Sequence, residues 1–255
     1  MPKYFIMPED IDTDKGSVSI AGENADHLIT TLRTRPGDEV TVCRGDCMDY
    51  ICEVTDVFSG KNKRCTLKIL SVRPVSEPRI KIKLYQALPK TGKMEYIIQK
   101  CVEMGIYEIV PIYTENSSVS ALSGSKQTRY RKISEAAAKQ SMRGFIPCIR
   151  QPVTLGQAIE DSVGNDLVFA SYENEDQTSL KDILSGCNLT AISSAAFFVG
   201  SEGGFSDREA DAFKNANIPR VSLGARVLRT ETAGFAVLTI LMYVSNELSV
   251  NRGEF

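Results

Sequence analysis

Two short apolar runs, each followed by a glycine-containing loop and then by a helical pattern, constrain the fold of this chain most strongly. Residues 195–199 form a continuous apolar run that ends at the sequence GSEGGFS of residues 200–206. A run of this length is typical of a buried strand, and the glycines after it allow a sharp turn and a close approach of the main chain to a ligand. Ser206 and Glu209 have the spacing of a capping box, which predicts that a helix begins there.

The same pattern then repeats. Residues 221–223 are strand-like, Gly224 turns the chain, and Thr230 is a candidate cap for an apolar helix that we expect over residues 230–248. The carboxyl ends of parallel strands meet at one edge of a sheet, where open α/β sheets bind their ligands. The two loops therefore predict an active site at this edge.

The segment 1–72 predicts a small β-barrel domain. Short runs rich in β-branched residues alternate with glycine- and proline-containing turns, and the expected strands are residues 18–20, 39–43, 50–57 and 65–70. Residues 27–33 are a candidate helical insert. Two prolines within residues 73–79 indicate a stiff linker to a second domain, which we expect over residues 73–255.

Beyond this linker, strand and helix patterns alternate, which predicts an α/β domain with a mainly parallel sheet. The expected strands are residues 80–87, 109–112 and 167–170, and the expected helices are residues 92–104, 126–143, a short one capped by Thr154 and Gln157, and 178–184.

Composition excludes several classes of function. The seven cysteines contain no CxxC pair and there is a single histidine, His27, so we expect a reduced, cytoplasmic protein without a metal site. No secretory signal or apolar stretch long enough to cross a membrane is read from the sequence. A P-loop is not expected either, because Gly92-Lys93 lacks the upstream glycine and the following Ser or Thr.

Charge is distributed unevenly along the chain. Residues 73–150 contain 14 Lys and Arg against 6 Asp and Glu, although the whole chain has a net charge of −2. This basic segment is compatible with a site for a polyanion and equally with solvated helix faces.

The two loops also carry polar residues that a simple turn does not require. Glu202 is a carboxylate between glycines, whereas Thr230 and Glu231 alone could be a helix cap and a first-turn acid. Two such clusters at neighbouring strand ends favour a functional site over a structural one.

These motifs resemble those of the bacterial 16S ribosomal RNA uridine N3-methyltransferase family (the RsmE type) of the SPOUT class. The resemblance rests on GSEGGFS at 200–206, SLGARVLRTETA at 222–233, KMEYIIQKCVEMG at 93–105 and EAAAKQSMR at 135–143, and it extends to the amino-terminal residues 3–6, 27–28 and 32–33. The family usually has proline where this chain has Ser201, and proline would stiffen the turn.

The resemblance implies a PUA-like β-barrel, an α/β domain with a trefoil knot, a homodimer, and S-adenosylmethionine as the methyl donor. The residues that it implies for cofactor binding are Ser171, Tyr172, Gly200, Ser201, Glu202, Gly203, Ser222, Leu223, Gly224, Leu228 and Thr232.

Methylation at uridine N3 requires that N3 lose its proton. A carboxylate could take that proton, and a cation could stabilise the charge that spreads to the ring carbonyls. We expect Arg229 in the second role and Glu231 or Glu202 in the first, although Glu202 and Arg229 could instead pair with each other.

The expected partner is 16S rRNA or the 30S subunit, contacted by basic residues suited to phosphate neutralisation. These are Arg33, Arg35, Lys90, Lys93, Lys126, Arg129, Arg131, Lys132 and Arg143. Two alternatives stay open: the same fold acting on another rRNA or tRNA site, and a non-catalytic assembly factor in which Ser201 deforms the cofactor loop.

The expected helix over residues 230–248 is apolar nearly all round. One sheet cannot cover such a helix, which predicts a helix-to-helix homodimer contact, with complete burial within one chain as the alternative.

Overall fold

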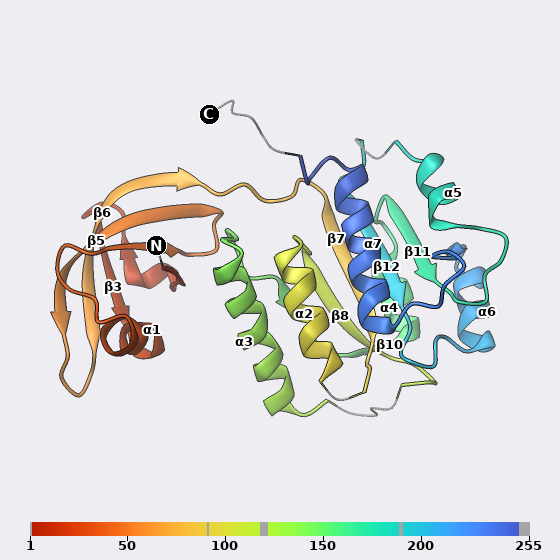
Figure 1. The fold of residues 1–255 in the computed structure, drawn as a ribbon, viewed down its shortest axis with the longest axis horizontal. Coiled ribbons are helices and arrows are strands. Elements are labelled where there is room, and N and C mark those ends of the chain that lie inside the picture. The colour runs from red at the N-terminus through yellow and green to blue at the C-terminus, as the bar shows by residue number, and fades with distance from the viewer. Residues whose placement is uncertain (1, 91, 118–121, 189–190, 250–255) are drawn as a thin grey trace. The chain divides into compact units, whose positions relative to one another are not determined.

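The structure, a computed structural model, describes residues 2–90, 92–117, 122–188 and 191–249. It divides into two compact units, one formed by Met1–Glu77 with Ala138–Ile146 and the other by Pro78–Ala137 with Pro147–Phe255. Figure 1 shows the elements of both units, coloured from red at the amino terminus to blue at the carboxyl terminus.

The first unit is built on a six-stranded sheet of order β1-β4-β5-β6-β3-β2, in which only the β1–β4 pair is parallel. Its strands are β1 Lys3–Phe5, β2 Ile11–Asp12, β3 Ser17–Ala21, β4 Glu39–Cys43, β5 Met48–Phe58 and β6 Arg64–Pro74. The four predicted strands are confirmed as β3 to β6. The sheet is therefore mainly antiparallel, and its closure as a PUA-like barrel stays a prediction.

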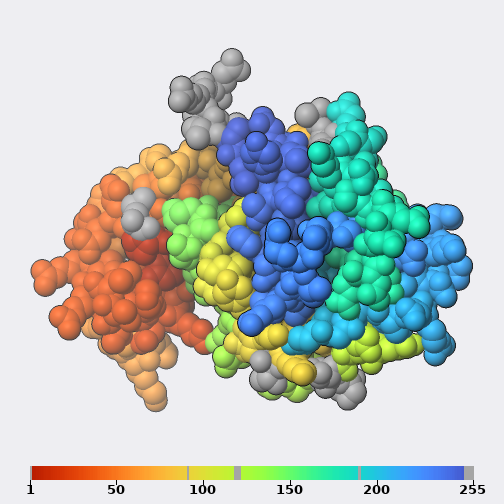
Figure 2. Space-filling view, turned by 45° about the vertical axis from the view of Figure 1, so that its right-hand side comes forward, coloured from red at the N-terminus to blue at the C-terminus, as the bar shows by residue number. Residues whose placement is uncertain are grey.

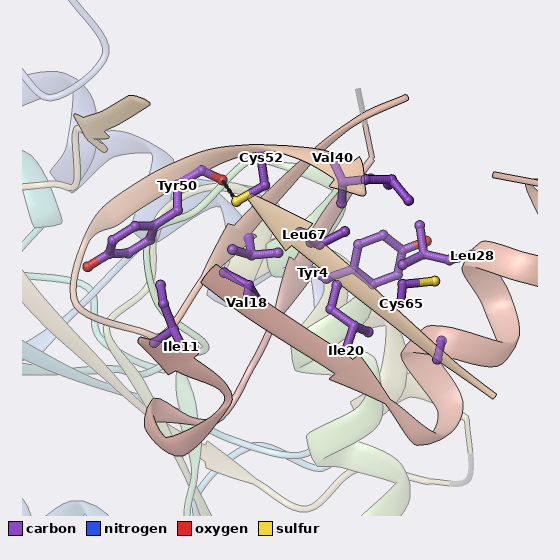
Figure 3. Packing of buried hydrophobic residues seen from close by; sticks show 13 residues of the cluster. Tyr4, Ile11, Val18, Ile20, Leu28, Val40, Tyr50, Cys52, Cys65 and Leu67 are labelled. Carbon is purple, nitrogen blue, oxygen red and sulfur yellow. Dashed lines mark hydrogen bonds between the residues drawn. The ribbon is translucent and has the colours of Figure 1, made fainter. Parts of the chain in front are cut away.

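Alternating residues of these strands form the core of the first unit. In β3, Val18 and Ile20 are buried and Ser19 is exposed, as expected for a strand with one face toward the core. Figure 3 shows their side chains packed with Tyr4 and Leu67 from two other strands. This packing explains why β-branched runs predicted the strands correctly.

The predicted linker begins too early. Strand β6 continues through Arg73 and Pro74, which pair with Asp49 and Met48 of β5. Proline is tolerated there because it lies at the end of the strand. The predicted insert at 27–33 is confirmed as helical, formed by helix α1 Gly22–Asp26 and a π-helical turn, His27–Thr31.

The second unit contains an all-parallel sheet of order β10-β8-β7-β12-β11-β13, with β9 also paired to β8. Its strands are β7 Lys81–Ala87, β8 Glu108–Tyr113, β9 Cys148–Ile149, β10 Val153–Thr154, β11 Leu167–Ser171, β12 Ser194–Val199 and β13 Arg220–Val221. Its helices are α2 Lys93–Glu103, α3 Gly124–Gln140, α4 Leu155–Ser162, α5 Leu180–Ser185, α6 Asp207–Asn215 and α7 Thr230–Val244. The prediction of an α/β domain with a parallel sheet is confirmed, whereas the trefoil knot stays a prediction.

Helices cover both faces of this sheet. Tyr85 and Phe198 pack in one cluster with Ala158 of α4 and Phe213 of α6, while α7 and α2 lie side by side on the other face. Both predicted capping boxes are present, at Thr154 for α4 and at Ser206 for α6.

Several predicted boundaries are wrong, among them the ends of three elements. Helix α3 ends at Gln140 rather than Arg143, because Met142 has a positive φ of 59°. Strand β13 ends at Val221 rather than at residue 223, and helix α7 ends at Val244 rather than Leu248.

Helix α7, predicted to be apolar nearly all round, is covered on one side and exposed on another. Leu238 and Met242 are buried, whereas Ile240 is 40% exposed. The sheet and α2 therefore cover the face that contains Leu238, and part of the apolar surface of the helix stays exposed.

Candidate functional site

A cavity of about 470 Å³ lies where three strands of the second unit end. It is lined by residues from the segments that follow β11, β12 and β13, namely 171–182, 199–205 and 222–233. Figure 2 shows α7 and the segment before it, in blue, beside the blue-green segment that contains α5. The structure thus brings together the strand ends that the sequence singled out.

Most of the residues implied for cofactor binding line this cavity: Ser171, Tyr172, Gly200, Ser201, Ser222, Leu223, Gly224 and Leu228. The cavity lining does not include Glu202, Gly203 or Thr232. The Glu202 carboxylate pairs with Lys93, the Gly203 carbonyl accepts from Asn116, and Thr232 is exposed in the first turn of α7.

Close contacts within the loop require glycine at position 200. A Cβ added to Gly200 would lie 2.9 Å from both the Cα and the carbonyl carbon of Gly204. Gly204 itself has a φ of +65°, a main-chain conformation that residues other than glycine rarely adopt. The loop folds back on itself at a distance that only glycine permits.

A buried hydrogen-bond network anchors the start of this loop. The Thr230 hydroxyl donates to the Gly200 carbonyl at 2.6 Å and accepts from Nε2 of Gln86 at 2.9 Å. Gln86 is fully buried in β7. The prediction that Thr230 caps α7 is wrong: Arg229 is the N-cap residue, and the Thr230 hydroxyl is used for this tertiary contact instead.

A lysine holds the two candidate carboxylates. Nζ of Lys93 lies 2.9 Å from Oε1 of Glu202 and 3.5 Å from Oε2 of Glu231. Burial disfavours the charged form of Glu202, but hydrogen bonds from Lys93 and from the Lys90 amide outweigh it and lower the pKa of this carboxyl. The contact with Glu202 raises the pKa of Lys93 in turn.

Arg229 does not pair with Glu202, the alternative considered for these residues, because Lys93 occupies that position. Arg229 is exposed at the N-cap of α7, immediately before Thr230 and Glu231. The other cation of the segment 222–229, Arg226, lines the cavity.

Sequence reasoning missed the acidic side of the cavity. Glu173, Glu175 and Asp176 closely follow β11, and Asp182 lies at the start of α5. For the first three, the position after a strand end was the signal that could have identified them. Two of them also serve the local structure, since Glu175 accepts from the amides of residues 177 and 178 and Asp182 completes a capping box.

A second cavity, of about 520 Å³ and almost entirely apolar, adjoins the first. It is lined by α5, α7 and the segment 222–228, and it shares Leu223 and Leu228 with the first cavity. An apolar wall therefore borders the polar strand ends.

The basic residues proposed for RNA contact fall into two groups. Arg33 and Arg35 of the first unit, and Lys90, Lys126, Arg129, Arg131 and Lys132 of the second, are exposed. Arg129 also pairs with Glu95 at 2.7 Å. Lys93 is engaged by the carboxylates described above, and Arg143 is 6% exposed and pairs with Glu77 at 2.6 Å.

The cavity fits a nucleoside-type cofactor in size and in its polar groups. The buried hydroxyl of Ser171 has no hydrogen-bond partner within the part of the chain that the structure describes, and a bound molecule with a polar edge would satisfy it. Within the same residues, there is no cluster of three potential metal ligands and no helix suited to spanning a membrane.

Comparison with known proteins agrees with this geometry. Residues 76–242 match the RNA methyltransferase domain family. The chain is 29% identical to the ribosomal RNA small subunit methyltransferase E of Bacillus subtilis, over the full length of both.

Two solved structures are similar over nearly the whole chain. A Legionella pneumophila methyltransferase in complex with SAM is 29% identical, with a TM-score of 0.81 over 95% of this chain and 96% of that one. The ribosomal RNA small subunit methyltransferase E of Neisseria gonorrhoeae, bound to S-adenosyl methionine, is 25% identical, with a TM-score of 0.82 over 96% and 98%. The chain thus belongs to the RNA methyltransferase family and, within it, to the ribosomal RNA small subunit methyltransferase E group.

Proposed function

We propose that this protein transfers a methyl group from S-adenosylmethionine to N3 of a uridine in 16S rRNA. The observation that carries this proposal is the cavity formed by three segments at neighbouring strand ends, in a chain whose relatives are named as small-subunit rRNA methyltransferases. The two similar structures that hold this cofactor support the choice of methyl donor.

The cavity residues suit the chemical groups of that cofactor. Leu223 and Leu228 offer an apolar surface for the adenine, and Ser171 offers a hydroxyl. Glu173 and Asp176 supply negative charge for the cationic sulfonium and ammonium groups. When bound, S-adenosylmethionine supplies the methyl group as an electrophile.

We assign proton transfer to Glu231. Its side chain is 17% exposed, and Nζ of Lys93 lies 3.5 Å from the buried Oε2 atom and orients the carboxylate. Oε2 accepts no hydrogen bond from the described residues. Glu202 is the weaker candidate because two donors already hold it and its pKa is lowered. Arg229, two positions before Glu231 and exposed, would stabilise the negative charge on the uracil carbonyls.

RNA phosphates would contact the exposed cations Arg33, Arg35, Lys90, Lys126, Arg129, Arg131 and Lys132. Lys93 and Arg143 are left out of this set because carboxylates of this chain engage them and their side chains are only 33% and 6% exposed. Arg129 also pairs with a carboxylate but is kept because its side chain is 67% exposed. The target uridine must be unpaired or flipped out of its helix, since base pairing hides N3. We also propose a cytoplasmic location, because the expected substrate is naked 16S rRNA or the 30S subunit.

A homodimer is also part of the proposal. Helix α7 leaves Ile240 40% exposed and Tyr243 74% exposed, and burial of this apolar surface would favour association of two copies. Light scattering at micromolar concentration tests it, and a monomer would contradict it.

The function is tested by calorimetry with S-adenosylmethionine and by nucleoside mass spectrometry of rRNA from a strain that lacks the gene. We expect one cofactor site per chain and loss of N3-methyluridine from 16S rRNA, restored by the wild-type gene. If a methyl group is lost from tRNA or from another rRNA instead, that RNA is the substrate and not 16S rRNA. A chain that binds no cofactor would be an assembly factor.

A further inference from the structure

The glycine loop is tied to a turn from a different part of the second unit. Oγ of Ser201 donates to the main-chain carbonyl of Asn116 at 2.9 Å, and Nδ2 of Asn116 donates to the Gly203 carbonyl at 2.8 Å. We refer to these two reciprocal hydrogen bonds as the clasp. Ser201 is 6% exposed, so its hydroxyl is engaged in the protein interior.

The turn that carries Asn116 is itself fixed. The Ser117 amide donates to the Thr114 carbonyl at 3.0 Å, and the hydroxyls of the same two residues are 2.7 Å apart. The Glu115 amide donates to Glu209 at 2.9 Å, and Glu209 is the buried acid of the capping box of α6. The clasp therefore connects the loop to a turn that is held at both its hydroxyls and its amides.

The loop needs such a restraint because of its composition. Glycine loses more conformational freedom on folding than any other residue, and residues 200–204 contain Gly200, Gly203 and Gly204. The serine at position 201 does not fix φ as a proline would. A Cβ on Gly203 would lie 3.0 Å from the Cβ of Asn116, so the loop and the turn are in close contact.

We propose that Asn116 and Ser201 are positioning residues for the methyl donor, with the clasp restraining a loop that is rich in glycine. The inference rests on the proposed function. Gly200 and Ser201 line the cavity, so the clasp sets the orientation of the main-chain groups that meet the cofactor. A loop that is ordered before binding does not have to be ordered by the ligand, and this raises affinity.

The test compares Ser201→Ala, Asn116→Ala and the double variant with the wild-type protein by calorimetry with S-adenosylmethionine. Each single change should weaken binding about three- to tenfold, the range that one hydrogen bond supports. Stoichiometry should stay at one site per chain. In methylation assays, KM for the cofactor should rise while kcat at saturating cofactor changes less than about twofold.

Matched controls are available at the end of α4 and in the turn after it. The Ser162 hydroxyl and Nδ2 of the Asn165 side chain also donate to main-chain carbonyls, at 2.7 and 2.8 Å, and neither residue lines the cavity. Ser162→Ala and Asn165→Ala should leave cofactor affinity unchanged even if they lower the melting temperature. Ser201→Thr keeps the hydroxyl and should retain more affinity than Ser201→Ala.

Three outcomes decide the matter. If both Ser201→Ala and Asn116→Ala bind the cofactor with wild-type affinity, the proposed positioning role of the clasp is wrong. It is also wrong if only the stoichiometry falls while the affinity is unchanged, because that result would indicate unfolding of a fraction of the molecules. If a variant does not fold, Asn116→Asp, which keeps the size but replaces the donor by an acceptor, is measured instead. A wild-type protein that binds no S-adenosylmethionine contradicts the proposed function rather than the clasp.

Discussion

The Thr230 hydroxyl donates a hydrogen bond of 2.6 Å to the carbonyl of Gly200 and so joins the first residue of α7 to the residue that follows β12. Gln86 of the neighbouring strand β7 donates to the same hydroxyl. The cavity loop therefore starts from a point that two strands and a helix hold together.

Thr230→Val should lower the free energy of unfolding by about 1–3 kcal/mol, because it leaves a buried carbonyl and the Gln86 amide with fewer partners. Urea denaturation measures the difference. Thr239 is a matched control in the same helix, since its hydroxyl donates to the Phe235 carbonyl at 2.8 Å without leaving the helix. Equal losses in Thr230→Val and Thr239→Val would show that the tertiary bond adds nothing.

Gly200→Ala should destabilise the protein and abolish cofactor binding. The added methyl group would meet main-chain atoms of Gly204 at 2.9 Å, and the main chain of a tight loop cannot yield as a flexible side chain can. A Cβ added to Gly156 in α4 would meet no atom within 4 Å, and Gly156→Ala should stabilise the helix by up to about 1 kcal/mol. Thermal unfolding and calorimetry distinguish the two; a fully active Gly200→Ala would refute the packing argument.

Glu231→Gln should reduce methyl transfer at saturating cofactor by about 10²- to 10⁴-fold, the usual contribution of a general base. Glu202→Gln should have a smaller effect, because Glu202 acts by holding Lys93 and the Lys90 amide. Single-turnover assays with 16S rRNA measure both. If Glu231→Gln turns over at the wild-type rate, the proton leaves by another route.

Arg131 and Lys93 should differ in the salt dependence of RNA binding. Replacing the exposed Arg131 by Ala should reduce the slope of log K against log salt by about 0.7–0.9, as expected for one lost phosphate contact. Lys93→Met should leave the slope nearly unchanged and lower turnover, because Lys93 already neutralises Glu202 and lies near Glu231. Filter binding over a salt series provides the slopes. A reduced slope for Lys93→Met would show that Lys93 contacts an RNA phosphate.

Stability should fall in acid through Asp161. Burial disfavours its charged form, but hydrogen bonds from Tyr85 at 2.6 Å and Arg150 at 2.7 Å outweigh burial and lower its pKa. A carboxyl whose pKa is lower in the folded state stabilises the fold above its unfolded pKa of about 4, and this stabilisation is lost as the pH falls through the folded value.

Asp161→Asn should therefore be less stable than the wild type by about 2 kcal/mol at pH 7, with a smaller difference at a pH of about 3, below the unfolded pKa. Urea titrations at the two pH values measure it. An Asp161→Asn difference that is independent of pH would show that the charge on this carboxyl is not responsible.

Local sequence signals predicted the elements but not the tertiary use of their side chains. Strand β4 was predicted with its observed bounds, and the capping boxes at Thr154 and Ser206 mark real helix starts, because these signals depend on residues close together in sequence. Thr230 has the same local character, yet its hydroxyl bonds to Gly200, thirty positions earlier. The spacing of residues along the chain does not predict a partner that is this far away in sequence.

The candidate site shows the same division. The loops after β12 and β13 were recognisable from their glycines, whereas the interaction of Lys93 with Glu202 and Glu231 joins three segments that only folding brings together. Arg143 was grouped with the surface cations by its charge, but its pairing with Glu77 places it in the interior of the first unit.

The membership of residues 138–146 in the first unit makes that unit discontinuous in sequence. A gene fragment that stops at residue 77 would lack Arg143, leaving the Glu77 carboxylate without its guanidinium partner, and would lack Gly144, whose carbonyl accepts from Cys43 and Cys47. Studies that express the amino-terminal part alone should therefore graft residues 138–146 onto it through a short connector, rather than truncate the chain at a single point.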